Sequence, residues 1–91
     1  MFLTWIILGM VVAAAAVITV TVVITAAVIR DLMHNNSSMN NSFSATVEKK
    51  FKDGNHTVIK VKLRDNSGNT STQEIRSEQG ASVYEGQTIY K

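Results

Sequence analysis

Few side chains in this sequence are of the types that carry out catalysis or bind metals. His34 and His56 are the two histidines, cysteine is absent, and neither histidine has a carboxylate or a second histidine at a metal-ligand spacing. The run Asp53-Gly54-Asn55 lacks the other oxygen ligands of a twelve-residue calcium loop. No serine lies in a nucleophile elbow, and no glycine loop is of the phosphate-binding kind. We therefore expect no enzyme activity, no metal and no cofactor.

Five cations are candidates for a basic surface. Alternation along a predicted β-hairpin places on one outer face Lys50, Lys52, Lys60, Lys62 and Arg64. Such a surface could meet anionic lipid headgroups, each cation contributing about 1 kcal/mol near the membrane. The alternative is a solvated sheet face on which lysine prevents aggregation. The net charge of +2 is too small to indicate nucleic acid as a partner.

The elements that must carry these residues begin with a long uncharged segment. The chain has 91 residues, and residues 1–29 contain no charged side chain. A helix of roughly 20 apolar residues spans a bilayer. The β-branched run Val17–Thr25 favours a strand in water, but a lone strand in hydrocarbon leaves its backbone unpaired. The sequence therefore predicts a single transmembrane helix over residues 1–32. A signal peptide cleaved after the tract Ala13–Ala16 is the alternative.

Small residues inside this predicted helix are candidates for helix–helix packing. Gly9 and Ala13 lie four residues apart, as do Ala15 and Thr19, and this spacing lets two helices approach closely. The predicted packing residues are Gly9, Ala13, Ala14, Ala15, Ala16 and Thr19. The alternative is that small residues are simply common in such helices.

An Asn- and Ser-rich stretch separates the predicted helix from a β-rich region. Residues 33–42 lack periodicity and predict a flexible linker. From Phe43 onward apolar residues alternate, and Asp53-Gly54-Asn55 is a turn signal between two strands. A three-residue loop there predicts the cross-strand pairs Lys52–His56, Glu48–Lys60, Val47–Val61 and Ala45–Leu63.

Further turn signals complete the prediction of a small antiparallel all-β domain over residues 43–91. A turn at 65–69 precedes a strand over 70–76, and a short return strand or strand pair covers 83–84 and 88–90. Four or five strands would form an open barrel or a curled sheet. Tyr84, Tyr90 and Phe51 are expected in its core. Because few apolar side chains serve a domain of this size, we expect a partner to stabilise it.

Three groups of residues carry a family resemblance: Ala45-Thr46-Val47 with Lys49 and Lys50, Val61-Lys62-Leu63 leading to Asp65–Gly68, and Tyr84–Gln87. In this order they resemble small bacterial single-pass membrane proteins of the DUF2500 type, which have one N-terminal span, a polar linker and a compact β domain. The chain lacks the aromatic-rich second strand and the long last strand of that group. The coarse plan is also similar to type IV pilins, but no acidic residue lies early in the helix.

Two functions fit this predicted architecture. The first is a non-catalytic accessory or structural subunit of a larger membrane complex. It would be a single-pass protein of the cell membrane, with a C-terminal domain that the sparse Lys and Arg residues place weakly on the cytoplasmic side. Its partners would be membrane lipid and other membrane-protein subunits. The alternative is self-assembly into a filament or ring, with the helix as its core and the β domains paired at their edges.

Overall fold

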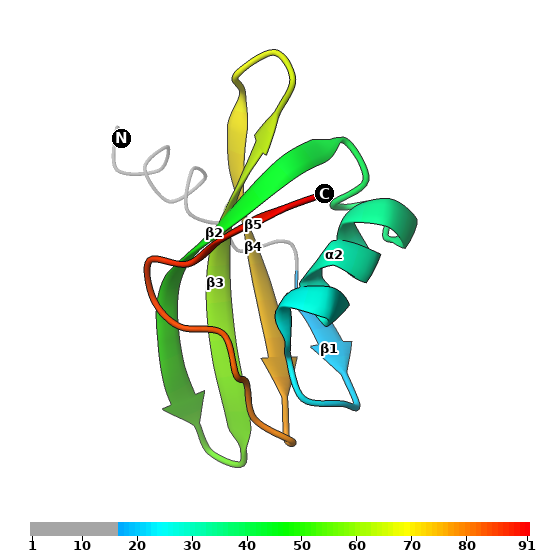
Figure 1. The fold of residues 1–91 in the computed structure, drawn as a ribbon. Coiled ribbons are helices and arrows are strands. Elements are labelled where there is room, and N and C mark those ends of the chain that lie inside the picture. Colours follow the sequence, from blue (N-terminus) through cyan, green and yellow to red (C-terminus); the bar gives the residue numbers. More distant parts are fainter. Residues whose placement is uncertain (1–16) are drawn as a thin grey trace, which may run out of the picture.

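The computed structural model describes residues 17–91, which form one sheet and one helix (Figure 1). In chain order the elements are β1 (Val17–Val20), α2 (Ala26–Asn35), β2 (Ser42–Asp53), β3 (His56–Asp65), β4 (Thr70–Ser77) and β5 (Thr88–Tyr90). The five strands lie in the order β1-β4-β3-β2-β5. Neighbouring strands are antiparallel except β1, which runs parallel to β4.

The structure corrects the prediction of a transmembrane helix. Within residues 17–91 no helix is long and apolar enough to cross a membrane. Residues 17–20 are a strand instead, and α2 has ten residues. The predicted fold class of one spanning helix before an all-β domain is therefore wrong, and the single-pass assignment and the cell-membrane location lose the feature on which they rested.

The physical reason for this correction is the pairing of β1. A strand at Val17–Val20 would leave its backbone groups without partners only if it stood alone in hydrocarbon. In the structure Ile18 pairs with Ile75 and Val20 with Ser77, so β4 provides these partners. Once the backbone is paired, the preference of β-branched side chains for extended structure decides the conformation.

Helix α2 begins beside this strand and contributes to the core. Thr25 is its N-cap, and its hydroxyl oxygen accepts a hydrogen bond from the Val28 N–H at 3.1 Å. Ile29 and Met33, four residues apart, are buried, while Arg30 is exposed. The arrangement is that of a short amphipathic helix with one face on a sheet.

Residues 33–42, predicted as a flexible linker, pack as part of the fold. They contain the end of α2 and a turn in which Met39 is fully buried. The Asn36 side chain accepts a hydrogen bond from the Ser38 N–H at 2.8 Å. The Ser42 hydroxyl donates to the Met39 carbonyl at 2.6 Å. Two buried methionines thus anchor a segment whose Asn and Ser content suggests flexibility.

The β2–β3 hairpin has a tighter turn than predicted. Asp53 pairs with His56, so the predicted pair of Lys52 with His56 is wrong and the loop contains only Gly54 and Asn55. Gly54 has a φ of +65° and Asn55 does not have a positive φ, as in a type II′ turn. Glycine at the first loop position permits this turn.

A β-bulge then restores the predicted register farther along the hairpin. The register shifts between Val47 and Lys49, so Glu48 has no partner and Lys49, rather than Glu48, lies opposite Lys60. Beyond the bulge the predicted pairs Val47–Val61 and Ala45–Leu63 are confirmed. The bulge matters for function because it changes which β2 side chains share a face with β3.

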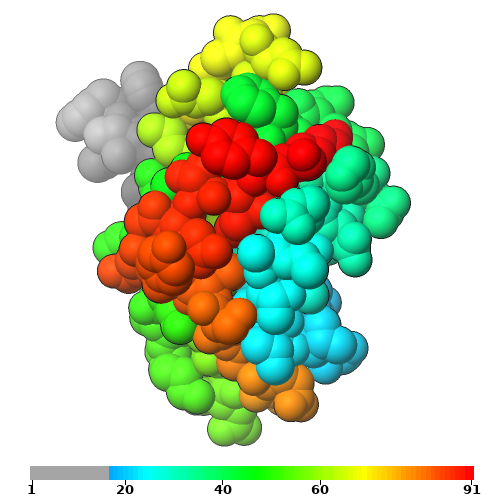
Figure 2. Space-filling view, in the orientation of Figure 1, coloured from blue at the N-terminus to red at the C-terminus, as the bar shows by residue number. Residues whose placement is uncertain are grey.

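The core lies on one face of the sheet, which α2, residues 78–87 and β5 cover (Figure 2). Its buried residues are Ile24, Ile29, Met33, Met39, Ala45, Val47, Ile59, Val61, Leu63, Ile75, Val83 and Ile89. The first four come from segments predicted as membrane helix and linker. The core is therefore larger than residues 43–91 alone could provide.

Candidate functional site

Of the predicted helix-packing residues, Thr19 alone lies within the described structure. Gly9, Ala13, Ala14, Ala15 and Ala16 lie outside the described residues. Thr19 lies in β1 opposite Arg76 and is exposed.

The structure separates the five predicted surface cations into two groups. Lys60, Lys62 and Arg64 alternate along β3 and lie on the outer face, opposite the core. The bulge places Lys50 and Lys52 level with the core-side residues of β3. The Lys50 ammonium donates to the Ala81 and Val83 carbonyls at 3.0 Å each, so this lysine holds a loop. Lys49 takes its place on the outer face.

A groove on this outer face combines aromatic, basic and hydroxyl side chains. We call it the aromatic–basic groove; its volume is about 230 Å³ and it is lined by Phe43, Ser44, Thr46, Lys62, Arg64, Thr88 and Tyr90. Thr46 lies opposite both Lys62 and Thr88, and Ser44 lies opposite both Arg64 and Tyr90. The lining residues thus come from three adjacent strands, β3, β2 and β5.

The two aromatic rings of the groove are exposed. Tyr90 is 62% exposed and Phe43 is 37% exposed. Tyr84 and Phe51 are exposed as well, so the expectation that Tyr84, Tyr90 and Phe51 belong to the core is wrong. The missed signal for Tyr90 is alternation: Ile89 occupies the core position of β5, which turns the next residue outward.

The other half of the outer face is electrically balanced. One guanidinium nitrogen of Arg76 lies 2.8 Å from a Glu74 carboxylate oxygen and 3.4 Å from one of Asp53. His56 Nε2 lies 3.8 Å from a Glu78 carboxylate oxygen. Among residues 17–91, Lys49, Lys60, Lys62 and Arg64 take part in no ion pair. Two of these cations, Lys62 and Arg64, line the aromatic–basic groove.

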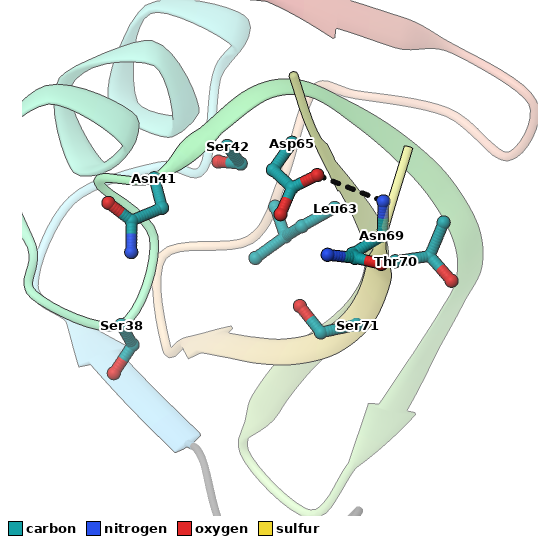
Figure 3. Close-up of a pocket in the computed structure, with 8 residues that line it drawn as sticks. All are labelled: Ser38, Asn41, Ser42, Leu63, Asp65, Asn69, Thr70 and Ser71. Atoms are coloured by element: carbon teal, nitrogen blue, oxygen red, sulfur yellow. Dashed lines mark hydrogen bonds between the residues drawn. The ribbon is translucent and has the colours of Figure 1, made fainter. Parts of the chain in front are cut away.

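A second hollow, the polar pocket, lies between the turn after α2 and the β3–β4 turn (Figure 3). It has a volume of about 240 Å³ and is lined by Ser38, Asn41, Ser42, Leu63, Asp65, Asn69, Thr70 and Ser71. A carboxylate oxygen of Asp65 accepts from the backbone N–H groups of Ser67 and Asn69 at 2.9 Å each. Its only carboxylate thus holds a turn, and no base or second acid accompanies it. Within residues 17–91 no three potential metal ligands cluster anywhere.

The third surface feature is the β1 edge, which we define as residues 17–23. In the described part of the chain β1 pairs with β4 alone, so its other side has no strand neighbour. Val17, Val22 and Val23 are 49%, 51% and 41% exposed. The Val22 carbonyl accepts a hydrogen bond from the buried Ser77 hydroxyl at 2.6 Å, which fixes the end of this edge. The edge is therefore apolar, uncharged and held in place.

Comparison with known proteins adds no further constraint on function. No protein-family model matches the chain, and no curated protein and no solved structure matches it. The resemblance to proteins of the DUF2500 type remains a prediction from the quoted residues.

Proposed function

We propose that the protein is a non-catalytic assembly module whose β1 edge pairs with the β1 edge of a second copy. The chemistry of this edge supports the proposal. Residues 17–29 contain no charged side chain, and three valines of the edge are exposed. Sheet edges that must stay single are usually blocked by charges, proline or a covering element. An apolar edge with unpaired backbone groups is instead a template for a further strand.

A second copy provides a strand that matches this edge. β1 consists of Val17, Ile18, Thr19 and Val20, all β-branched and uncharged. Two such strands can pair antiparallel about a two-fold axis, so each satisfies the free backbone groups of the other. The same contact removes exposed valine from water, at about 25 cal/mol per Å² of apolar surface. The two sheets would then be continuous across the dimer.

Two of the described hollows are compatible with a non-catalytic role. Neither the polar pocket nor the aromatic–basic groove combines an acid, a base and a nucleophile. An accessory subunit of a larger complex would use the same edge, but with a strand from a different protein. Under this alternative, the purified chain would not associate with itself through the edge.

Sedimentation velocity of the purified full chain over a range of concentrations tests the proposal. We expect reversible self-association for the unmodified chain. The double variant Val17→Lys with Val22→Lys places charges on the edge, and we expect at least tenfold weaker association, a change of about 1.4 kcal/mol. Both positions are exposed, so the variant should keep its fold, which circular dichroism can verify.

A matched control separates this edge from charge in general. Asn35→Lys with Ser37→Lys adds two lysines at exposed positions at the end of α2 and in the turn after it, and should associate like the unmodified chain. All three proteins share residues 1–16, so differences among them report on the edge. A chain that is monomeric at every concentration, or equal association of both variants, contradicts the proposal. Recovery only in a fixed ratio with a different protein favours the accessory subunit instead.

A further inference from the structure

We propose that the aromatic–basic groove binds single-stranded nucleic acid. In this arrangement the phosphates contact Lys62 and Arg64, and bases stack on Tyr90 and Phe43. Lys60 and Lys49 extend the positive surface along the same face. This proposal uses the outer face of the sheet and does not depend on pairing at the β1 edge.

The distribution of charge supports an anionic ligand. Lys62 and Arg64 lie opposite Thr72 and Thr70 of β4, whereas Lys60 lies opposite Glu74. Asp53 and Glu74 pair with Arg76, while Asp65 holds a turn. The cations of the groove face are left without such partners in the described structure.

One cross-strand pair indicates that this positive charge carries a cost. Lys49 lies directly opposite Lys60 on β2, while Glu74, whose carboxylate pairs with Arg76, lies opposite Lys60 on β4. Like charges in directly opposed positions destabilise a sheet. No carboxylate of residues 17–91 forms an ion pair with either lysine. A bound polyanion would replace this repulsion by attraction.

The aromatic residues favour a ligand with flat rings over a purely ionic one. Tyr90 is exposed although its backbone is fixed: the Arg30 Nε–H donates to its carbonyl at 3.0 Å. The neighbouring Lys91 N–H donates to the Phe43 carbonyl at 2.9 Å, which ties the two aromatic residues together. Farther along the same groove, the hydroxyls of Thr46 and Thr88 share a hydrogen bond of 3.0 Å. Exposed rings on a fixed backbone are suitable platforms for base stacking.

The regular spacing of the cations along β3 favours single-stranded nucleic acid as the ligand. Lys60, Lys62 and Arg64 recur at every second residue, or roughly every 7 Å along the strand. A polymer with regularly spaced phosphates can follow this row while its bases turn toward the aromatic rings. In a duplex the base faces are stacked inside and cannot reach Tyr90. A lipid headgroup surface offers anions but no rings.

Fluorescence anisotropy with a labelled oligodeoxythymidylate of about 10 nucleotides tests the proposal with the full chain. If four cations contact phosphates, binding should weaken roughly 50-fold between 50 and 200 mM salt. Tyr90→Ala should weaken binding roughly 5- to 150-fold, the range for loss of one stacked base. Tyr84→Ala is the matched control, since Tyr84 is 63% exposed but lies outside the groove, and it should bind like the unmodified chain.

A second matched pair tests the charges. Lys62→Gln should weaken binding severalfold and lower the salt slope by about 0.7, whereas Lys52→Gln, which removes the same charge from the other side of β2, should do neither. Equal effects within either matched pair overturn the proposal. Binding to phosphatidylserine vesicles or heparin that is as tight as to the oligonucleotide, and insensitive to Tyr90→Ala, identifies a general anion surface and overturns it as well.

Discussion

The two edges of the sheet are completed in opposite ways. At one edge, β5 is short and leaves much of β2 without a strand partner. Nearby loop and side-chain groups form hydrogen bonds with the β2 backbone instead. The Val47 N–H donates to the Gln87 carbonyl, and the Gly86 N–H donates to the Val47 carbonyl, each at 2.8 Å. The Lys50 N–H donates to a Glu85 carboxylate oxygen at 2.9 Å. Loop and side-chain groups thus provide the hydrogen bonds that a longer β5 would provide.

At the β1 edge the recorded contacts face inward. The Ile24 N–H donates to the Gly80 carbonyl at 2.9 Å, and the Ser82 N–H donates to the Ile24 carbonyl at 3.0 Å. These bonds join the segment to the rest of the fold, but within residues 17–91 no strand lies on its far side. The fold thus blocks one edge with loop and side-chain hydrogen bonds, beside which Lys49, Lys50 and Lys52 lie, whereas the described part of the β1 edge is apolar.

The largest effect should come from breaking the attachment of the β1 edge to the core. Ile24 is fully buried, and we expect Ile24→Ala to lower the free energy of unfolding by about 2–5 kcal/mol through lost burial and the cavity left behind. This is a large part of the roughly 5–15 kcal/mol that stabilises a typical domain. Urea denaturation followed by circular dichroism measures the difference.

Val23→Ala is the control for this prediction, because the neighbouring Val23 is 41% exposed. Its truncation should change the free energy of unfolding by no more than about 0.5 kcal/mol. Equal small effects of both substitutions would show that residues 17–25 are not part of the cooperatively folded domain, which would remove the basis of the comparison between edges.

We expect a smaller decrease in the free energy of unfolding when the hydrogen bonds of Ser77 at the end of the β1 edge are removed. The buried Ser77 hydroxyl donates to the Val22 carbonyl at 2.6 Å and accepts from the Gln79 N–H at 3.0 Å. Ser77→Ala leaves both groups without this partner, and we expect a loss of about 1–3 kcal/mol in unfolding free energy. The exposed Ser71 provides a control, since Ser71→Ala should be nearly neutral in the same urea titration. A neutral Ser77→Ala would mean that water replaces both bonds.

The sequence predicted the β2–β3–β4 region well because its signals are local. Alternation and the glycine turns determine the positions of these strands, and the Val47–Val61 register follows from the buried face. The pairing of β1 with β4 could not be predicted in this way, because it joins residues 17–20 to residues 74–77. Hydrophobicity without charge is common to membrane helices and buried strands, so composition alone did not distinguish them.

The surface features were only partly predictable for the same reason. Lys60, Lys62 and Arg64 share a face by simple alternation along one strand. Lys49, rather than Lys50, lies on the outer face because of the bulge at Glu48, and the sequence has no clear signal for this bulge. The groove also needs Tyr90 beside Ser44, a contact between residues far apart in the sequence that only the tertiary structure provides.

The smallest predicted effect concerns the β5 edge, where Glu85 bonds to the backbone of β2. Glu85→Ala removes the acceptor of the Lys50 N–H, and we expect a loss of about 0.5–1.5 kcal/mol in unfolding free energy, because the bond is exposed. Amide hydrogen exchange at Lys50 should become faster. Glu78→Ala removes a different exposed carboxylate, which lies 3.8 Å from His56 Nε2, and should leave the Lys50 amide unchanged.

The same Glu85→Ala variant separates two explanations of edge pairing. It frees a backbone donor on β2, yet the surrounding residues Lys49, Lys50 and Lys52 are charged. If charge is what blocks an edge, the variant should sediment like the unmodified chain, because two such edges repel each other. New self-association would instead mean that any free backbone group suffices for pairing, and the apolar character of the β1 edge would then lose its special significance.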